Sequence, residues 1–115
     1  MKDTMFSGTK GKYRIEIESP GFDMVRDEFE ITLKQGTKSV NYDKADLIDR
    51  VIVVGGVEKH EYYFTFNTDP SVSPYFSPAG DIIVVVKAYV PDEDFGTNGI
   101  RTEVDRFRLV NVQPV

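Results

Sequence analysis

Apolar and polar residues alternate along most of this chain with a period of two, which is the spacing of an extended strand and not of a helix. The strongest run covers residues 81–91, where every even position from Ile82 to Val90 is apolar. The odd positions are apolar at the start, at Ile83, and amphipathic at the end, at Tyr89. Successive β-branched residues favour a pleated strand. We therefore expect a central strand here, covered on both faces in its first half and stopped by its terminal proline.

Shorter segments with alternating or clustered apolar residues predict further strands. They are residues 13–17, 29–34, 38–42, 51–54, 60–67 and 101–112. Gly55 and Gly56 supply the positive φ angles that a tight hairpin turn needs. In the last segment the inward parity shifts between Leu109 and Val110, as a β-bulge would cause. These signals recur about every ten residues, which is typical of an all-β domain.

Residues 43–50 carry the single helical signal, with Asp43 as a possible cap, and are too short for more than one or two turns. Without a longer amphipathic helix, parallel strands with helical crossovers are excluded. The sequence predicts an antiparallel immunoglobulin-like β-sandwich of about seven strands. It lacks the cysteine pair and the tryptophan of a true immunoglobulin domain. We expect residues 1–12 to form a flexible N-terminal arm and residues 13–115 a single domain.

Composition narrows the possible functions. The 115 residues are enough for one domain with its own core, and the chain contains no cysteine, which excludes thiol nucleophiles, zinc–thiolate sites and iron–sulfur clusters. A net charge of −5 argues against a nucleic-acid partner and against docking on anionic membranes. No signal peptide or apolar spanning segment is evident. We expect no cofactor and a protein that is cytoplasmic when made.

Two groups of polar residues are candidate chemical sites. His60 is the sole histidine, and neither a nucleophile elbow nor a second metal-binding histidine accompanies it, which favours a surface role. Asp92, Asp94 and Asn98 place oxygen ligands of the kind calcium prefers in one loop. Their spacing does not fit an EF-hand, and charged loop residues are usually solvated. The two interpretations of this loop, metal site or solvated turn, remain open.

The loop at residues 69–80 is the main candidate for a partner-binding or ligand-binding site. Tyr75 and Phe76 lie between Pro74 and Pro78, so two large rings are carried by a stiffened segment. Exposed aromatic side chains give much contact area at low entropic cost. The alternative is that the rings fold back and cap the open end of the sandwich.

Three segments carry a resemblance to a known group of proteins. Residues 28–36 read EFEITLKQG, residues 88–95 read AYVPDEDF and residues 101–104 read RTEV. In these segments the chain resembles small uncharacterised β-sandwich proteins encoded among phage or prophage structural genes. The resemblance covers about half of the chain and implies a virion component or an accessory of tail or baseplate assembly. The proline loop around Tyr75 is longer than in those proteins.

Together these observations favour a non-enzymatic structural or assembly protein that acts through protein–protein contacts. Its expected partners are other proteins, in a homo-oligomer or a virion such as a phage tail or baseplate. The alternative is a ligand-binding module that recognises a glycan or peptide through loops at one end of the sandwich. A small hydrolase that uses His60 is the third hypothesis.

Overall fold

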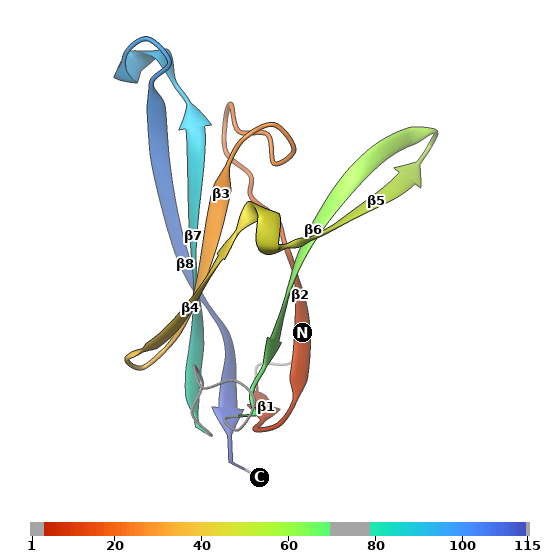
Figure 1. Ribbon diagram of the computed structural model, residues 1–115, viewed down its shortest axis with the longest axis vertical. Helices are drawn as coiled ribbons and strands as arrows, with labels where there is room; N and C mark the ends of the chain where they lie inside the picture. Colours follow the sequence, from red (N-terminus) through yellow and green to blue (C-terminus); the bar gives the residue numbers. More distant parts are fainter. Residues whose placement is uncertain (1–3, 70–78, 115) are drawn as a thin grey trace.

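The chain folds into two packed β-sheets (Figure 1). The computed structural model describes residues 4–69 and 79–114. One sheet has five strands in the order β1-β8-β7-β3-β4, and the other has three in the order β2-β6-β5. The predicted all-β sandwich is therefore confirmed. The strands are β1 (Thr4–Phe6), β2 (Lys10–Ile15), β3 (Phe29–Gln35), β4 (Lys38–Asp43), β5 (Ile48–Val54), β6 (Val57–Asn67), β7 (Gly80–Pro91) and β8 (Ile100–Gln113).

Strand β7 is the central strand that the sequence predicts. It lies between β8 and β3, and its even-numbered residues from Ile82 to Val90 are all buried. It ends at Pro91, as expected. Because β7 is paired on both edges, its polar backbone groups are satisfied by hydrogen bonds while its apolar face fills the space between the sheets.

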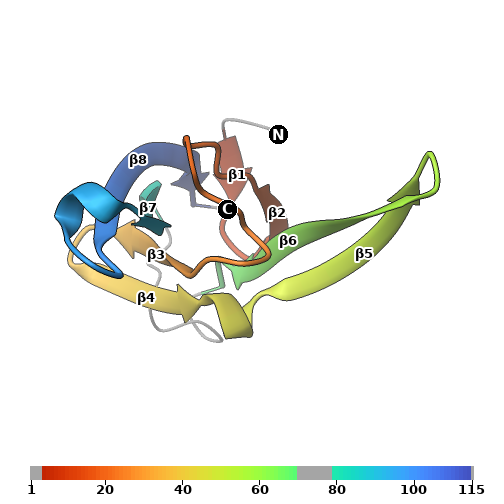
Figure 2. The same cartoon turned by 90° about the horizontal axis from the view of Figure 1, so that it is seen from above.

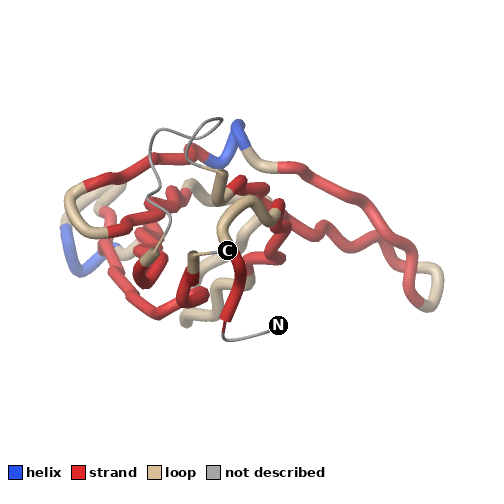
Figure 3. The backbone as a smooth tube through the Cα atoms, turned by 90° about the horizontal axis from the view of Figure 1, so that it is seen from below, coloured by secondary structure: helices blue, strands red, loops and turns tan. Residues whose placement is uncertain are grey.

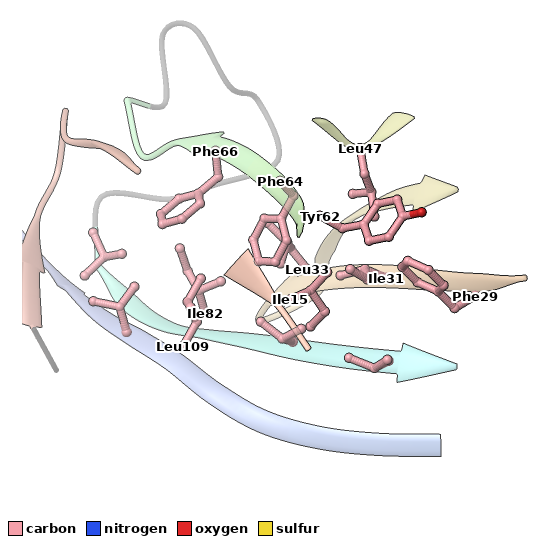
Figure 4. Packing of buried hydrophobic residues seen from close by; sticks show 14 residues of the cluster. Ile15, Phe29, Ile31, Leu33, Leu47, Tyr62, Phe64, Phe66, Ile82 and Leu109 are labelled. Atoms are coloured by element: carbon pink, nitrogen blue, oxygen red, sulfur yellow. The ribbon is translucent and has the colours of Figure 1, made fainter. Parts of the chain in front are cut away.

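Aromatic side chains from the smaller sheet complete the core. Tyr62, Phe64 and Phe66 alternate along β6 and point toward the opposite sheet, where Ile31, Leu33 and Ile82 lie (Figure 4). The strand expected at residues 60–67 is thereby confirmed, with its aromatic residues of one parity in the core. Gly11 of β2 lies against the ring of Phe66, where any side chain would collide with it.

The predicted irregularity in the last strand is also present. The register between β7 and β8 shifts between Ile82 and Ile83, whose partners are Val110 and Arg108. Leu109 is the extra residue, and it is buried together with Val110. The bulge lets two neighbouring residues face the core, which a regular strand does not allow.

The N-terminal segment differs from expectation, whereas the helical signal gives the short turn that its length allows. Within the segment expected to be a flexible arm, Thr4–Phe6 pairs in parallel with residues 111–113 of β8, and Lys10 begins β2. The helical signal at residues 43–50 yields one 3₁₀ turn, η1 (Lys44–Asp46), in which the Asp43 N–H donates to the Asp46 carboxylate at 2.9 Å. The rest of that segment begins β5, because pairing with β6 overrides the weak local preference.

One hairpin leaves the body of the sandwich. The second half of β6 covers the core, whereas its first half, together with β5, extends beyond the other strands (Figures 1–3). A second 3₁₀ turn, η2 (Glu93–Phe95), lies in the connection between β7 and β8. Within residues 4–69 and 79–114, no helix is long and apolar enough to cross a membrane.

Candidate interaction surface

The feature that stands out from the body is the hairpin at residues 48–61, called here the projecting hairpin. Val54 pairs with Val57 across the two-residue turn Gly55-Gly56. Both glycines have positive φ angles, 57° and 78°, as a type I′ turn requires. The twist of this turn matches that of the flanking strands, so the turn favours the pairing of β5 with β6.

The projecting hairpin exposes aliphatic side chains on both faces. Val51 and Val53 are 49% and 68% exposed and lie on the face that is continuous with buried Tyr62. Val54 and Val57, at 51% and 60%, lie on the opposite face. Contiguous exposed apolar surface on a folded protein marks an interaction site more often than scattered single residues do. The hairpin is therefore the candidate interaction surface.

Charged and aromatic groups fix the root of the hairpin on its outer face. Arg14 of β2 contacts the Glu61 carboxylate at 2.6 Å, and the Tyr63 hydroxyl donates to the same carboxylate at 2.8 Å. These two hydrogen bonds, that of Tyr63 foremost, hold the pKa of Glu61 below its usual range, and the carboxylate in turn raises the pKa of Tyr63. Arg50 lies over the Tyr63 ring at 5.2 Å from its centroid. The root is thus a polar network, in contrast to the apolar end.

A lysine anchors the segment that leads into β5. The Lys44 ammonium donates to the backbone oxygens of Val25 and Asp27 at 2.8 and 2.9 Å. It also lies over the rings of Phe29 and Tyr62 at 5.7 and 5.8 Å. These contacts hold η1 against the body, so the direction in which β5 departs is defined.

The same region holds a buried carboxylate. Arg26 donates two hydrogen bonds to Asp27, each 2.8 Å long, and these lower the pKa of Asp27 against the opposing effect of burial. The Asp27 side chain is 6% exposed, so its charge depends on this partner. The role of the pair is to shape the loop before β3.

A groove runs between the hairpin and the segment after β2. The pairing of β2 with β6 ends at Ile15, and the Ile17 N–H turns away to the Met24 sulfur at 3.4 Å. The groove has a volume of about 460 Å³ and is lined by residues that include Ile52 and His60. Beyond the pair formed by Ile15 and Tyr62, the edge of β6 on the β2 side is therefore not covered by any strand of the described residues.

His60 is on the projecting hairpin. Its Nδ1 lies 2.8 Å from the Asp49 carboxylate, and its ring stacks on Tyr62 with 6.3 Å between centroids. A histidine oriented by an aspartate is also part of a catalytic triad, but a triad needs a nucleophile within hydrogen-bond reach of the other nitrogen. Among the described hydrogen bonds of His60 there is none to a serine or threonine hydroxyl. The geometry is that of a cross-strand pair that stabilises the hairpin.

The other predicted site residues fall in two places. Pro74, Tyr75, Phe76 and Pro78 lie outside the described residues. In the loop after β7, the Asp92 carboxylate contacts Arg101 at 2.6 Å and accepts the Asp94 N–H at 3.0 Å.

Asn98 of the same loop adopts a φ of 58°, the left-handed conformation that asparagine tolerates. Across residues 4–69 and 79–114, no three acidic or histidine side chains form a group that could hold a metal ion. In the described structure, the Asp92 carboxylate shapes a turn.

The sequence interpretation overlooked the projecting hairpin as a surface. A usable signal was present, because residues 51–54 are apolar at both parities while Gly55-Gly56 limits the strand to a simple hairpin. Such a strand needs cover on both faces. The sequence does not reveal that the described part of the body leaves both faces of this strand exposed.

Comparisons with protein-family models, with curated proteins and with solved structures gave no match.

Proposed function

We propose that this chain is a non-enzymatic assembly protein that acts through protein–protein contacts, with the projecting hairpin as its contact surface. The observation that carries the proposal is the exposure of aliphatic side chains on both faces of a strand whose outer edge is also open. Natural proteins usually protect such edges with lysine, proline or a bulge. From Val51 to Val54 the edge of β5 has none of these.

The strand order supports a more specific fold within this proposal. In immunoglobulin-like sandwiches one sheet contains strands B, E and D, and the other contains G, F and C, extended in some members by C′. The orders β2-β6-β5 and β8-β7-β3-β4 correspond to these when strands are matched along the chain. The projecting hairpin would then be the D–E hairpin. A sandwich of this type presents its edges and loops to partners while its core stays closed.

The proposal includes a setting, a phage or prophage virion component, which rests on the resemblance of residues 28–36, 88–95 and 101–104 alone. Modules of such particles join their neighbours by adding strands or inserting loops across chains. The hairpin is suited to either contact, because it presents an open edge and an apolar end.

The experiment measures association and its dependence on the hairpin. Light scattering at rising protein concentration reports self-association, and size-exclusion chromatography after co-expression with the products of neighbouring genes reports other complexes. We expect at least one complex, and we expect Val53→Glu to abolish it, because a buried carboxylate without a partner is strongly unfavourable.

Val104→Glu is the matched control. Val104 is 59% exposed and lies on β8, in the opposite sheet from the hairpin. Its substitution adds the same charge and should leave the complex intact. A chain that stays monomeric and binds none of the co-expressed proteins contradicts the proposal, as does a complex that Val53→Glu leaves unchanged.

A further inference from the structure

The partner of the projecting hairpin can be specified from the hydrogen-bond pattern of β5. We propose that β5 pairs antiparallel with β5 of a second copy of this chain, about a two-fold axis at Val51. This inference rests on the proposed function, since it names one partner for the same surface. The two three-stranded sheets would then join into one continuous sheet.

The first step is to establish which backbone groups of β5 are free. At the far end of β6, the Thr68 N–H donates to the Thr9 oxygen at 3.0 Å, in register with the pairing of β2 and β6. Antiparallel pairs alternate between hydrogen-bonded and non-hydrogen-bonded. Even-numbered residues of β6 therefore bond toward β2, and odd-numbered ones, such as Lys59, bond toward β5. The two-residue turn agrees, because Val57 next to it belongs to the odd-numbered set.

The pairing register transfers this pattern to β5. Lys59 is opposite Ile52, and Val57 is opposite Val54, so the even-numbered residues of β5 bond to β6. The backbone N–H and C=O groups of Asp49, Val51 and Val53 consequently point to the outer edge. Within the described part of the chain no strand lies on that side of β5.

Symmetry then selects one register. A two-fold axis perpendicular to an antiparallel pair must pass midway between one residue and its own copy, because only this arrangement pairs outward-bonding residues of β5 with each other. Centring the axis on Asp49 or Arg50 places like charges opposite each other, which is destabilising. Centring it on Ile52 or Val53 leaves outward groups without partners.

The register centred on Val51 has neither fault. Val51 faces Val51 of the second copy, and Asp49 and Val53 face each other twice, so all three outward residues are bonded. Three such pairs supply about six backbone hydrogen bonds. On the other face Ile48 lies opposite Val54, and the exposed aliphatic side chains gain cross-strand neighbours. The edge of β5 is thus complementary to itself.

The natural absence of cysteine allows a direct test of this register. In a hydrogen-bonded antiparallel pair the Cα atoms are about 5.5 Å apart, but the Cβ atoms are farther apart than the roughly 3.5–4.5 Å of a disulfide. A short bis-maleimide reagent is therefore the suitable probe, and we expect it to cross-link Val51→Cys rapidly into a covalent dimer, measured on denaturing gels. Val57→Cys is the matched control, because it is at least as exposed and lies on the same hairpin, but on β6.

A mixing experiment tests the register further. Under mild oxidation Ile48→Cys and Val54→Cys should each form little disulfide-linked dimer alone and should cross-link when mixed, because each faces the other across the axis. Cross-linking of Val51→Cys no faster than that of Val57→Cys overturns the inference. So does efficient linkage of Ile48→Cys or Val54→Cys to itself.

A non-covalent measurement completes the test. Val51→Lys places two ammonium groups opposite each other at the axis, and we expect it to weaken dimerisation in sedimentation equilibrium by about tenfold or more. Val57→Lys should change it far less. If the unmodified chain is monomeric while a hairpin-dependent complex with another protein forms, pairing with a second copy is wrong and the proposed function stands. If no hairpin-dependent complex of either kind forms, the pairing of β5 with a second copy and the proposed function are both wrong.

Discussion

Strands β4 and β5 follow one another along the chain, and each forms the outer edge of its sheet, yet their edges differ in chemistry. By the same alternation of hydrogen bonds, the outward backbone groups of β4 belong to Ser39, Asn41 and Asp43. All three side chains are polar. The corresponding residues of β5 are Asp49, Val51 and Val53, of which two are valines. Both β4 and β5 are edge strands, but only β4 has polar side chains at all of its outward-bonding positions.

The two strands also differ in what lies beneath them. Tyr42 of β4 donates its hydroxyl to the Thr65 oxygen at 3.0 Å and stacks on Phe64 with 6.0 Å between centroids. β4 is therefore held over the core by its inner face. Along β5 only Ile52 is partly buried, and the strand extends beyond the core with its other apolar side chains exposed. Polar side chains at its edge and contacts with the core protect β4 from further pairing. The edge of β5 is apolar and has no such contacts, so it is open to pairing with a further strand.

The largest effect is expected where β4 and β6 meet in the core. Phe64 is 1% exposed and contacts the rings of Tyr13, Tyr42 and Phe66. Phe64→Ala should lower the free energy of unfolding by about 3–5 kcal/mol through lost burial and the cavity left behind. Val57→Ala, on the exposed half of the same strand, should change it by less than about 0.5 kcal/mol. Urea denaturation measures both, and equal effects would contradict the division of β6 into a core half and a projecting half.

The turns of the two hairpins give the next effect. In the turn between β3 and β4 the left-handed residue is Gly36, whereas both residues of the β5–β6 turn are left-handed glycines. Nothing lies within 4 Å of a Cβ added at Gly55, so a substitution there acts through the backbone alone. Gly55→Val should destabilise the hairpin by about 1–2 kcal/mol, because a branched side chain disfavours this conformation.

Gly55→Asn is the control at the same position, since Asn-Gly is a preferred type I′ pair. Because the hairpin projects from the body, its opening is local, and amide hydrogen exchange of residues 48–61 is the suitable measurement. Faster exchange in Gly55→Val and unchanged exchange in Gly55→Asn are expected. Equal exchange in the two variants would show that the turn does not hold the hairpin.

Exchanging the chemistry of the edges tests the comparison itself. Ser39→Val with Asn41→Val gives β4 the apolar outward pattern of β5, while the core contacts of Tyr42 remain. We expect this variant to self-associate about tenfold more strongly than the parent chain, from cross-strand contacts of valines that together gain about 1.4 kcal/mol. Sedimentation velocity measures the change. Ser39→Thr with Asn41→Thr, which keeps a polar side chain at both positions, is the control. No gain in association would mean that the polarity of β4 is not what protects it.

Much of the fold could be predicted from the sequence because most strands have a recognisable pattern of apolar residues. The even positions of residues 82–90, the parity of Tyr62, Phe64 and Phe66, and the irregularity at Leu109 all follow from the period of two and from the need to bury apolar residues. The Gly-Gly turn follows from the positive φ angles of a tight hairpin. These are local constraints, and they are confirmed.

The rest of the fold could not be predicted, because it depends on contacts between segments that are far apart in the sequence. Thr4–Phe6 is too short for a recognisable period, and it becomes a strand because residues 111–113 at the other end of the chain pair with it. Residues 51–54 and 83–86 are equally aliphatic, yet the second segment is paired on both edges and the first on one. Composition therefore predicts a strand in both cases, and tertiary arrangement decides which of them is an exposed surface.

The smallest effect concerns the polar root where β6 leaves the body. The pKa of Glu61 lies below its ordinary value of 4.5 because of hydrogen bonds from Tyr63 and then Arg14. A carboxylate whose pKa is depressed on folding stabilises the protein above the unfolded pKa, and this contribution is lost as the pH falls through the folded pKa. Glu61→Gln should therefore flatten the acid side of the curve of unfolding free energy against pH, most visibly below pH 4.5.

Glu61 is close to the surface, and its pairing with Arg14 is open to screening, so the difference between Glu61→Gln and the parent chain should shrink in high salt. Glu58→Gln is the matched control, because Glu58 lies on the same strand, is exposed, and forms no ion pair in the described structure. If Glu58→Gln flattens the curve as much as Glu61→Gln does, the effect comes from net charge and not from the root of the hairpin. If only Glu61→Gln does so, the polar root stabilises the departure of β5 and β6 from the body, whereas β4 is held by the contacts of Tyr42 with Thr65 and Phe64.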